Sequence, residues 1–120
     1  MAKRIFELPH PSSGVAGITF VQEMHKNCKL ICSWEFDLDQ PIIVSLEFIE
    51  VWSLKRTYLK SDHSAYDHVV DMGHSEYLDD IRRRLANKAL PFDNVRHYMI
   101  CFDDGPCWEF VCRDFNSLVD

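Results

Sequence analysis

The sequence predicts an α+β fold, with an antiparallel, strongly curved sheet of about five or six strands and one main helix before the C-terminal hairpin. Residues 28–36 alternate between apolar and polar side chains, as a half-buried strand does. Residues 76–87 instead carry an apolar stripe at helical spacing. Two further apolar runs, separated by Asp-Asp-Gly-Pro, follow between residues 95 and 115 and indicate a hairpin.

The N-terminal part predicts an arm and then two strands, within a single domain spanning residues 1–120. Two prolines and two serines among residues 1–13 favour a flexible arm. A first strand is expected near residues 18–22, and residues 28–36 form the most regular strand of the chain.

A long apolar run from Ile42 to Tyr58 is rich in β-branched and aromatic residues, which favours strand over helix. Because the run is long for one strand, we expect a bend or bulge near Glu50. The stretch at residues 62–74, DHSAYDHVVDMGH, has turn residues and no sustained period, so it predicts a polar connector.

The helix is expected from Glu76 to about Asn87. Ser75 is a suitable N-cap, and acidic residues in the first turns suit the helix dipole. The apolar stripe consists of Leu78, Ile81 and Leu85.

In the hairpin we expect Phe102 opposite Cys107, with an even number of residues in the turn. Tyr98, Ile100 and Glu109 would then share one face, and His97 would lie opposite Cys112. Both faces are mostly apolar, which predicts a strand pair covered on both sides.

Charge and composition exclude several functions. A net charge of −6 disfavours nucleic acid and anionic membranes, because phosphate neutralisation needs a basic surface. No window approaches the roughly 18 apolar residues of a membrane span. The five cysteines are an odd number, and no secretion signal is present, which favours reduced thiols and a cytoplasmic location.

The histidines and aspartates of residues 62–74 raise a metal hypothesis. His63, His68 and His74 are the candidate ligands, since imidazole binds zinc well. Their spacing does not place them on one helix face and matches no established motif. The competing interpretation, a polar connector whose side chains make turns and caps, is the stronger one, so no metal or other cofactor is predicted.

Glu109 stands between apolar residues on its strand, where a carboxylate needs a partner or a shifted pKa. One hypothesis is a pocket acid, in a small-molecule or enzyme site lined by Tyr98, Trp108 and Glu109. The simpler interpretation is a structural ion pair, with Arg56, Arg96 or Tyr98 as the partner.

Cysteine catalysis has little support in the sequence. Cys28, Cys32, Cys101 and Cys112 fall on apolar faces, where cysteine packs as a small hydrophobe. Cys107 flanks the hairpin loop and is the expected exposed thiol. No phosphate loop, nucleophile elbow or metalloprotease motif occurs.

Four segments give the chain a family resemblance: LEFIEVW (46–52), SEYL (75–78), RHYMICFD (96–103) and WEFVC (108–112). Over residues 44–114 the chain resembles the small acidic α+β immunity proteins of bacterial toxin systems and related domains. The resemblance implies stoichiometric binding to a toxin or other protein without catalysis, and it carries no functional residue onto this chain.

The sequence therefore favours a cytoplasmic, non-catalytic protein-binding domain of the immunity type over an enzyme. An acidic surface would suit a basic partner, and a homodimer remains open. The expected contact residues lie in two acidic loops: Asp62, His63, Asp67, His68, Asp71, His74, Asp103 and Asp104. The alternatives are the Tyr98, Trp108 and Glu109 pocket and the His63, His68 and His74 metal site.

Overall fold

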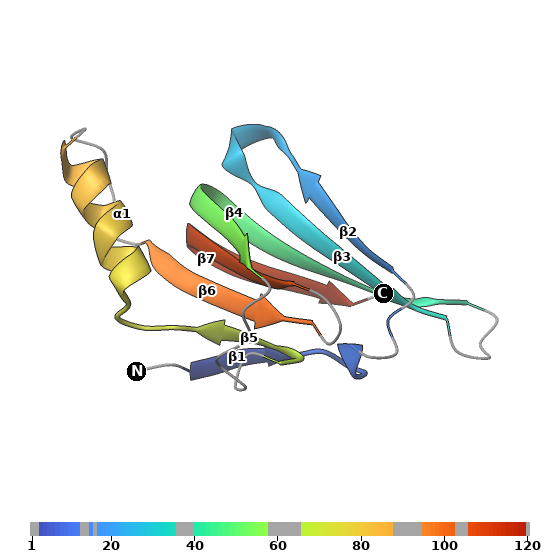
Figure 1. The fold of residues 1–120 in the computed structure, drawn as a ribbon. Helices are drawn as coiled ribbons and strands as arrows, with labels where there is room; N and C mark the ends of the chain where they lie inside the picture. Colours follow the sequence, from blue (N-terminus) through green and yellow to red (C-terminus); the bar gives the residue numbers. More distant parts are fainter. Residues whose placement is uncertain are drawn as a thin grey trace.

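In its described residues the computed structural model contains one antiparallel sheet and one α-helix (Figure 1). It describes residues 3–12, 15, 17–35, 40–57, 66–87, 95–102 and 106–119. Seven strands are ordered β1-β5-β6-β7-β4-β3-β2 in these residues. The elements are β1 (Lys3–Glu7), β2 (Gly17–Gln22), the short 3-10 helix η2 (Met24–Lys26), β3 (Cys28–Trp34), β4 (Ile42–Thr57), β5 (His68–Asp71), α1 (Glu76–Asn87), β6 (Arg96–Cys101) and β7 (Cys107–Val119). The α+β prediction is confirmed, but its strand number is too low.

The sheet is strongly curved, because aromatic rings from strands three places apart meet on one face. In a flat sheet such strands would lie roughly 14 Å apart, at about 4.8 Å per step. Phe20 of β2 instead stacks on Trp108 of β7, with ring centroids 5.0 Å apart. Phe6 of β1 lies 6.1 Å from Phe115, also of β7. The sheet therefore curls around its own inner face and encloses the main core there.

The bend predicted in the long apolar run is present in β4. Glu50 has a positive φ of 56°, and the ladder with β7 shifts between Val51 and Ser53. The Asn27 side chain accepts the Glu50 N–H at 2.9 Å, and Arg113 of β7 contacts the Glu50 carboxylate at 2.7 Å. These contacts stabilise a bulge at which β4 bends, so that this long strand follows the curvature of the sheet.

Two strands, β1 and β5, lie where the sequence analysis expects none. They pair with each other, and β5 also pairs with β6. The segment after β1 is held by Asp67, whose carbonyl accepts the Leu8 N–H and whose carboxylate accepts the Ser12 N–H, both at 2.9 Å. Within the arm expected at residues 1–13, residues 3–7 form strand β1. Within the connector expected at residues 62–74, residues 68–71 form strand β5.

The helix has the predicted bounds and the predicted cap. Ser75 Oγ accepts the Leu78 N–H at 3.1 Å, as an N-cap does. Leu78, Ile81 and Leu85 are buried against the outer face of the sheet, beside Val111 of β7. In Figure 1, α1 stands at the end where β6 begins, far from β2. No helix among the described residues has the length and apolar character needed to cross a membrane.

The C-terminal hairpin forms with a register one residue away from the expected one. Cys101, not Phe102, lies opposite Cys107, and a disulfide joins the two cysteines. The connection at residues 102–106 has an odd number of residues, whereas the expected pairing assumed an even number. A slip of one residue exchanges the faces of one strand relative to the other. Tyr98 therefore shares the inner face with Trp108, and Glu109 lies on the outer face with α1.

Candidate functional site

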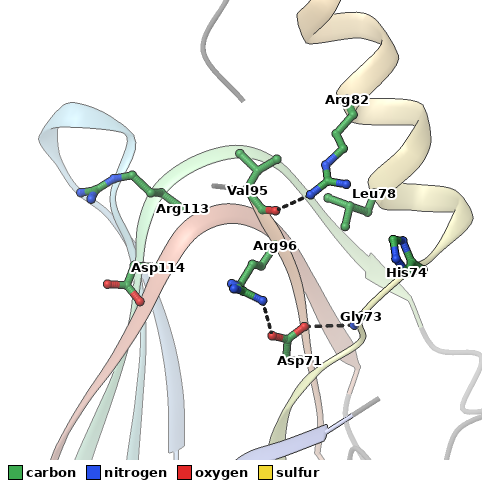
Figure 2. Close-up of a pocket in the computed structure, with 9 residues that line it drawn as sticks. All are labelled: Asp71, Gly73, His74, Leu78, Arg82, Val95, Arg96, Arg113 and Asp114. Carbon is green, nitrogen blue, oxygen red and sulfur yellow. Dashed lines mark hydrogen bonds and ion pairs between the residues drawn. The ribbon is translucent and has the colours of Figure 1, made fainter. Parts of the chain in front are cut away.

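A hollow of about 440 Å³ lies where β6 begins, between α1 and the bend of β7 (Figure 2). We call it the β6 hollow; it is lined by Asp71, Gly73, His74, Leu78, Arg82, Val95, Arg96, Arg113 and Asp114. Gly73 has a φ of 65°, which side-chain-bearing residues rarely adopt, and carries the chain from β5 towards α1. Segments distant in the sequence therefore meet around one space at the end of the sheet.

Two of the three arginines of the β6 hollow have carboxylate partners. Arg96 contacts Asp71 at 3.3 Å between Nη1 and Oδ2, and Asp71 also accepts the Gly73 N–H at 3.0 Å. The contact from Arg113 to Glu50 is made through Nε, and in Figure 2 the Arg113 side chain points away from Arg82 and Arg96. The charge of Arg96 is therefore paired with Asp71, and the charge of Arg113 is paired with Glu50.

Arg82 is different, because no carboxylate pairs with it among the described residues. Its Nη2 donates to the Val95 carbonyl at 3.3 Å, and its Nε is buried with no hydrogen-bond partner there. A guanidinium has five N–H donors, and a neutral carbonyl does not balance its charge. Among the described residues Arg82 is thus an incompletely satisfied cation on the wall of the β6 hollow.

Behind the start of α1, three side chains form a hydrogen-bonded row. Ser75 Oγ lies 2.8 Å from His97 Nδ1, and His97 Nε2 lies 2.9 Å from Glu109 Oε1. A carboxylate only accepts, so the neutral imidazole carries its hydrogen on Nε2 and accepts the serine hydroxyl at Nδ1. This is the order nucleophile, base and carboxylate, with the ring nitrogens exchanged relative to the usual serine-hydrolase arrangement.

The row is enclosed and charge-balanced. His97 and Glu109 are buried, at 3% and 8% exposure. Tyr77 packs edge-on against His97 and hydrogen-bonds Ser53 at 2.6 Å, while Lys55 Nζ lies 3.5 Å from Glu109 Oε2. Burial raises the pKa of Glu109, but the hydrogen bond from His97 and the charge of Lys55 lower it by more, so the net shift is downward. Glu109 is therefore an ionised, partnered carboxylate at neutral pH.

The ion-pair interpretation of Glu109 has the structure's support, although its partners are not the expected ones. Lys55 supplies the opposite charge and His97 a hydrogen bond, in place of Tyr98 and the two arginines, because the shifted register moves Glu109 to the outer face. Tyr98 and Trp108 belong to the inner core, on the opposite face from Glu109. The three residues of the proposed pocket therefore do not line one cavity.

Half of the predicted acidic contact residues can be placed. Asp67 binds the segment after β1, Asp71 contacts Arg96, and His74 is exposed at the wall of the β6 hollow. His68 belongs to β5, and its Nδ1 lies 2.8 Å from the Tyr66 carbonyl. Asp71 and His74 both line the β6 hollow, whereas Asp67 and His68 make separate local contacts. The remaining four, Asp62, His63, Asp103 and Asp104, lie outside the described residues.

The two candidate metal ligands that lie in the described residues, His68 and His74, do not converge on one point. His68 and His74 have different surroundings, since His68 Nε2 lies 3.8 Å from Glu7 of β1 and His74 faces the β6 hollow. The described residues contain no group of three or more histidines, cysteines or acids placed to hold a metal ion. His63 lies outside these residues.

The cysteines need two corrections. Cys107, expected as an exposed thiol, is buried in the disulfide with Cys101. Cys112 lies opposite Arg96 rather than His97, so the histidine and this thiol occupy different faces. Burial raises the pKa of Cys32 and of Cys112 to about 12, so both thiols are protonated and unreactive at neutral pH.

Sequence reasoning found Glu109 and Ser75 separately but not the row that links them. That link depends on the hairpin register, and a shift of one residue in the register decides whether Glu109 and His97 lie on the same face. Arg82 gave no signal, because a basic residue next to Arg83 and Arg84 has the pattern of a solvated helix face.

We found no protein family, curated protein or solved structure that matches this chain.

Proposed function

We propose that this chain is a non-catalytic protein-binding domain that pairs an extended segment of its partner with the outer edge of β2. Strand addition to a free edge supplies main-chain hydrogen bonds, and side-chain contacts add specificity. The observation that carries the proposal is the contrast between the two outer strands of the sheet, β1 and β2.

The β1 edge is protected, whereas the β2 edge is not. β1 has the sequence KRIFE, with three charged residues, and its register with β5 is irregular. Charges and irregularities are the features that keep outer strands from pairing with other chains. β2 has the uncharged sequence GITFVQ and pairs without a shift along β3, while no strand pairs with its outer side in the described part of the chain.

The charge of the chain favours a basic partner. A net charge of −6 steers positively charged proteins towards the molecule and raises their association rate at low salt. The resemblance to immunity proteins supports a toxin, such as a basic nuclease, as that partner. Asp67 and Asp71 are held by contacts within the chain, so we assign the primary contact to β2 rather than to the acidic stretch.

The test compares two lysine substitutions. Thr19 is exposed in the middle of β2, so Thr19→Lys places a charge on the edge without disturbing the core. Met24→Lys, at a side chain 80% exposed in η2, adds the same charge off the strand. Captured partners are purified and titrated against each variant. We expect Thr19→Lys to weaken binding at least tenfold and Met24→Lys to leave it unchanged.

Hydrogen exchange of the complex gives a second measurement, in which the β2 amides should become protected. Equal binding by both variants, or protection confined to other strands, would contradict the proposal. Repeated failure to recover a stoichiometric partner would do the same. A dimer seen by light scattering and abolished by Thr19→Lys would replace a distinct partner with a second copy of the chain.

The cytoplasmic location predicted from the cysteines has lost part of its support. Disulfides persist mainly in oxidising compartments, and Cys101 and Cys107 form one. The cytoplasmic location therefore remains a proposal, to be tested by fractionating cells that express the native gene.

The Ser75, His97 and Glu109 row supports a second candidate, a serine hydrolase acting on small esters. Ser75 Oγ would attack the ester carbonyl while His97 Nδ1 takes the hydroxyl proton. The alcohol would leave with that proton, and water would then hydrolyse the acyl-serine. This candidate ranks second, because His97 is only 3% exposed and the Ser75 hydroxyl already caps α1.

A fluorophosphonate probe tests the second candidate directly, since it labels activated serines. Labelling of the wild type at Ser75, with none in Ser75→Asn, would support a hydrolase. The asparagine keeps an acceptor for the Leu78 N–H and so preserves the helix cap. Absence of labelling together with no hydrolysis of short-chain nitrophenyl esters would exclude this candidate.

A further inference from the structure

We propose that the β6 hollow binds a singly charged carboxylate attached to a small apolar group, with Arg82 and Arg96 as its anchors. The volume of about 440 Å³ lies within the range of small-molecule sites. This inference is independent of the β2 edge and of the hydrolase candidate.

Arg82 supplies the strongest argument. Its side chain is partly buried, and within the described part of the chain its hydrogen bond goes to the neutral Val95 carbonyl. A cation removed from water without a counter-charge is costly unless an anion joins it. Within the described residues the Arg82 charge is unbalanced, and an external anion in the hollow would balance it.

Arg96 supplies a second guanidinium group to the β6 hollow. It uses one nitrogen on Asp71 and is 62% exposed, so further N–H groups are open to a ligand. Figure 2 shows Arg82 reaching down from α1 to the Val95 carbonyl, and below it the Arg96 guanidinium pointing towards Asp71. Guanidinium groups bind carboxylates through paired, planar hydrogen bonds.

The charges on the walls favour a singly charged anion. Arg96 and Arg113 are already paired with Asp71 and Glu50, so among the described residues that line the hollow Arg82 is the cation without a carboxylate partner. A phosphate dianion would bring excess negative charge close to the carboxylates of Asp71 and Asp114, which also line the hollow. A carboxylate, with a single negative charge, matches the charge of Arg82.

The apolar part of the ligand has its own surface. Leu78 and Val95 line the hollow and are buried members of the cluster under α1. Both are already buried, at 4% and 3% exposure, so the burial free energy would come mainly from the apolar surface of the ligand itself, a short alkyl chain or an aromatic ring placed against them.

An NMR titration of the isotopically labelled full chain tests this inference. Sodium benzoate, sodium hexanoate and inorganic phosphate are added separately at constant ionic strength. We expect saturable shifts of the Gly73 amide and the Arg82 Nε–H with both monocarboxylates, and binding of phosphate at least tenfold weaker. Arg82→Gln should weaken benzoate binding at least tenfold, whereas Arg83→Gln, at the adjacent and 76% exposed position, should not.

A peptide ending in phenylalanine, compared with its amidated form, distinguishes the sources of the carboxylate. Tighter binding by the free peptide than by benzoate indicates a protein C-terminus, and the reverse indicates a free acid. Arg96→Gln, at an exposed position, provides a second variant if Arg82→Gln does not fold. The absence of saturable shifts in the wild type, equal losses in Arg82→Gln and Arg83→Gln, or tighter binding of phosphate would each overturn the proposal. Thr19→Lys should retain full carboxylate binding, which separates this result from that for the β2 edge.

Discussion

At the scale of single residues, Glu109 shows how a charge is kept inside a sheet. It faces Lys55 across the strand pair and His97 diagonally, so each oxygen has a donor. Its sequence context indicated that a carboxylate there needs partners, and this held. The identity of the partners could not be predicted, because it depends on the registers of β7 with both of its neighbours.

Glu109→Gln should lower stability and reduce its dependence on acid. The folded-state pKa of Glu109 lies below its ordinary value. The stabilisation is therefore fully present above the unfolded pKa of about 4.3 and is lost as pH falls through the folded value. We expect a loss of about 1–3 kcal/mol at neutral pH, because a hydrogen-bonded charge is removed. Urea unfolding should show wild type and variant converging at low pH.

Glu47→Gln is the matched control for this prediction. Glu47 pairs with Lys29 at 3.8 Å on β4, and its side chain is 28% exposed. A partly exposed pair at this distance, with solvent screening its charges, should contribute less than the Glu109 contacts, about 0–1 kcal/mol. If the difference in the free energy of unfolding between wild type and Glu109→Gln stays constant down to low pH, ionised Glu109 is not the source of the stabilisation.

At the scale of elements, local signals predicted what local interactions stabilise. Ser75 and the stripe of Leu78, Ile81 and Leu85 specified α1 within twelve residues of sequence. The bend near Glu50 was predictable from the length of its apolar run. β1 and β5 were not, since each is short and gains its partner from a segment more than sixty residues away.

The hairpin disulfide should stabilise the fold modestly. It joins Cys101 to Cys107, six positions apart, and closing so small a loop constrains the unfolded chain by about 2 kcal/mol. Reduction with a phosphine should lower the free energy of unfolding by that amount. The double variant Cys101→Ser and Cys107→Ser should show no response to the reductant, because Cys28, Cys32 and Cys112 are free thiols. A response in the variant equal to that of the wild type would contradict the prediction.

At the scale of the whole molecule, the two halves of the sheet share one core. Residues from β3, β4, β6 and β7 belong to the same buried cluster, and Phe6 of β1 and Phe20 of β2 pack against it. The sequence predicted strong curvature in outline, but the contacts that set it join residues far apart in the chain. The position of the β6 hollow was unpredictable for the same reason.

Because the core is shared, the chain should unfold in one transition. Circular dichroism reports the sheet and helix, and tryptophan fluorescence reports Trp34, Trp52 and Trp108, which lie on three different strands, β3, β4 and β7. The two urea curves should coincide, as in a two-state domain. Separate midpoints would show that one half of the sheet can persist without the other.

The odd number of residues between Cys101 and Cys107 has a consequence for natural variation. Losing or gaining one residue there would carry Glu109 from the side of α1 into the apolar interior, or force the whole following strand to slide. Changes of two residues would leave every side chain of β7 on its present side. Divergent relatives should therefore differ in this connection by even steps, whatever else has changed, and that parity offers a way to recognise them.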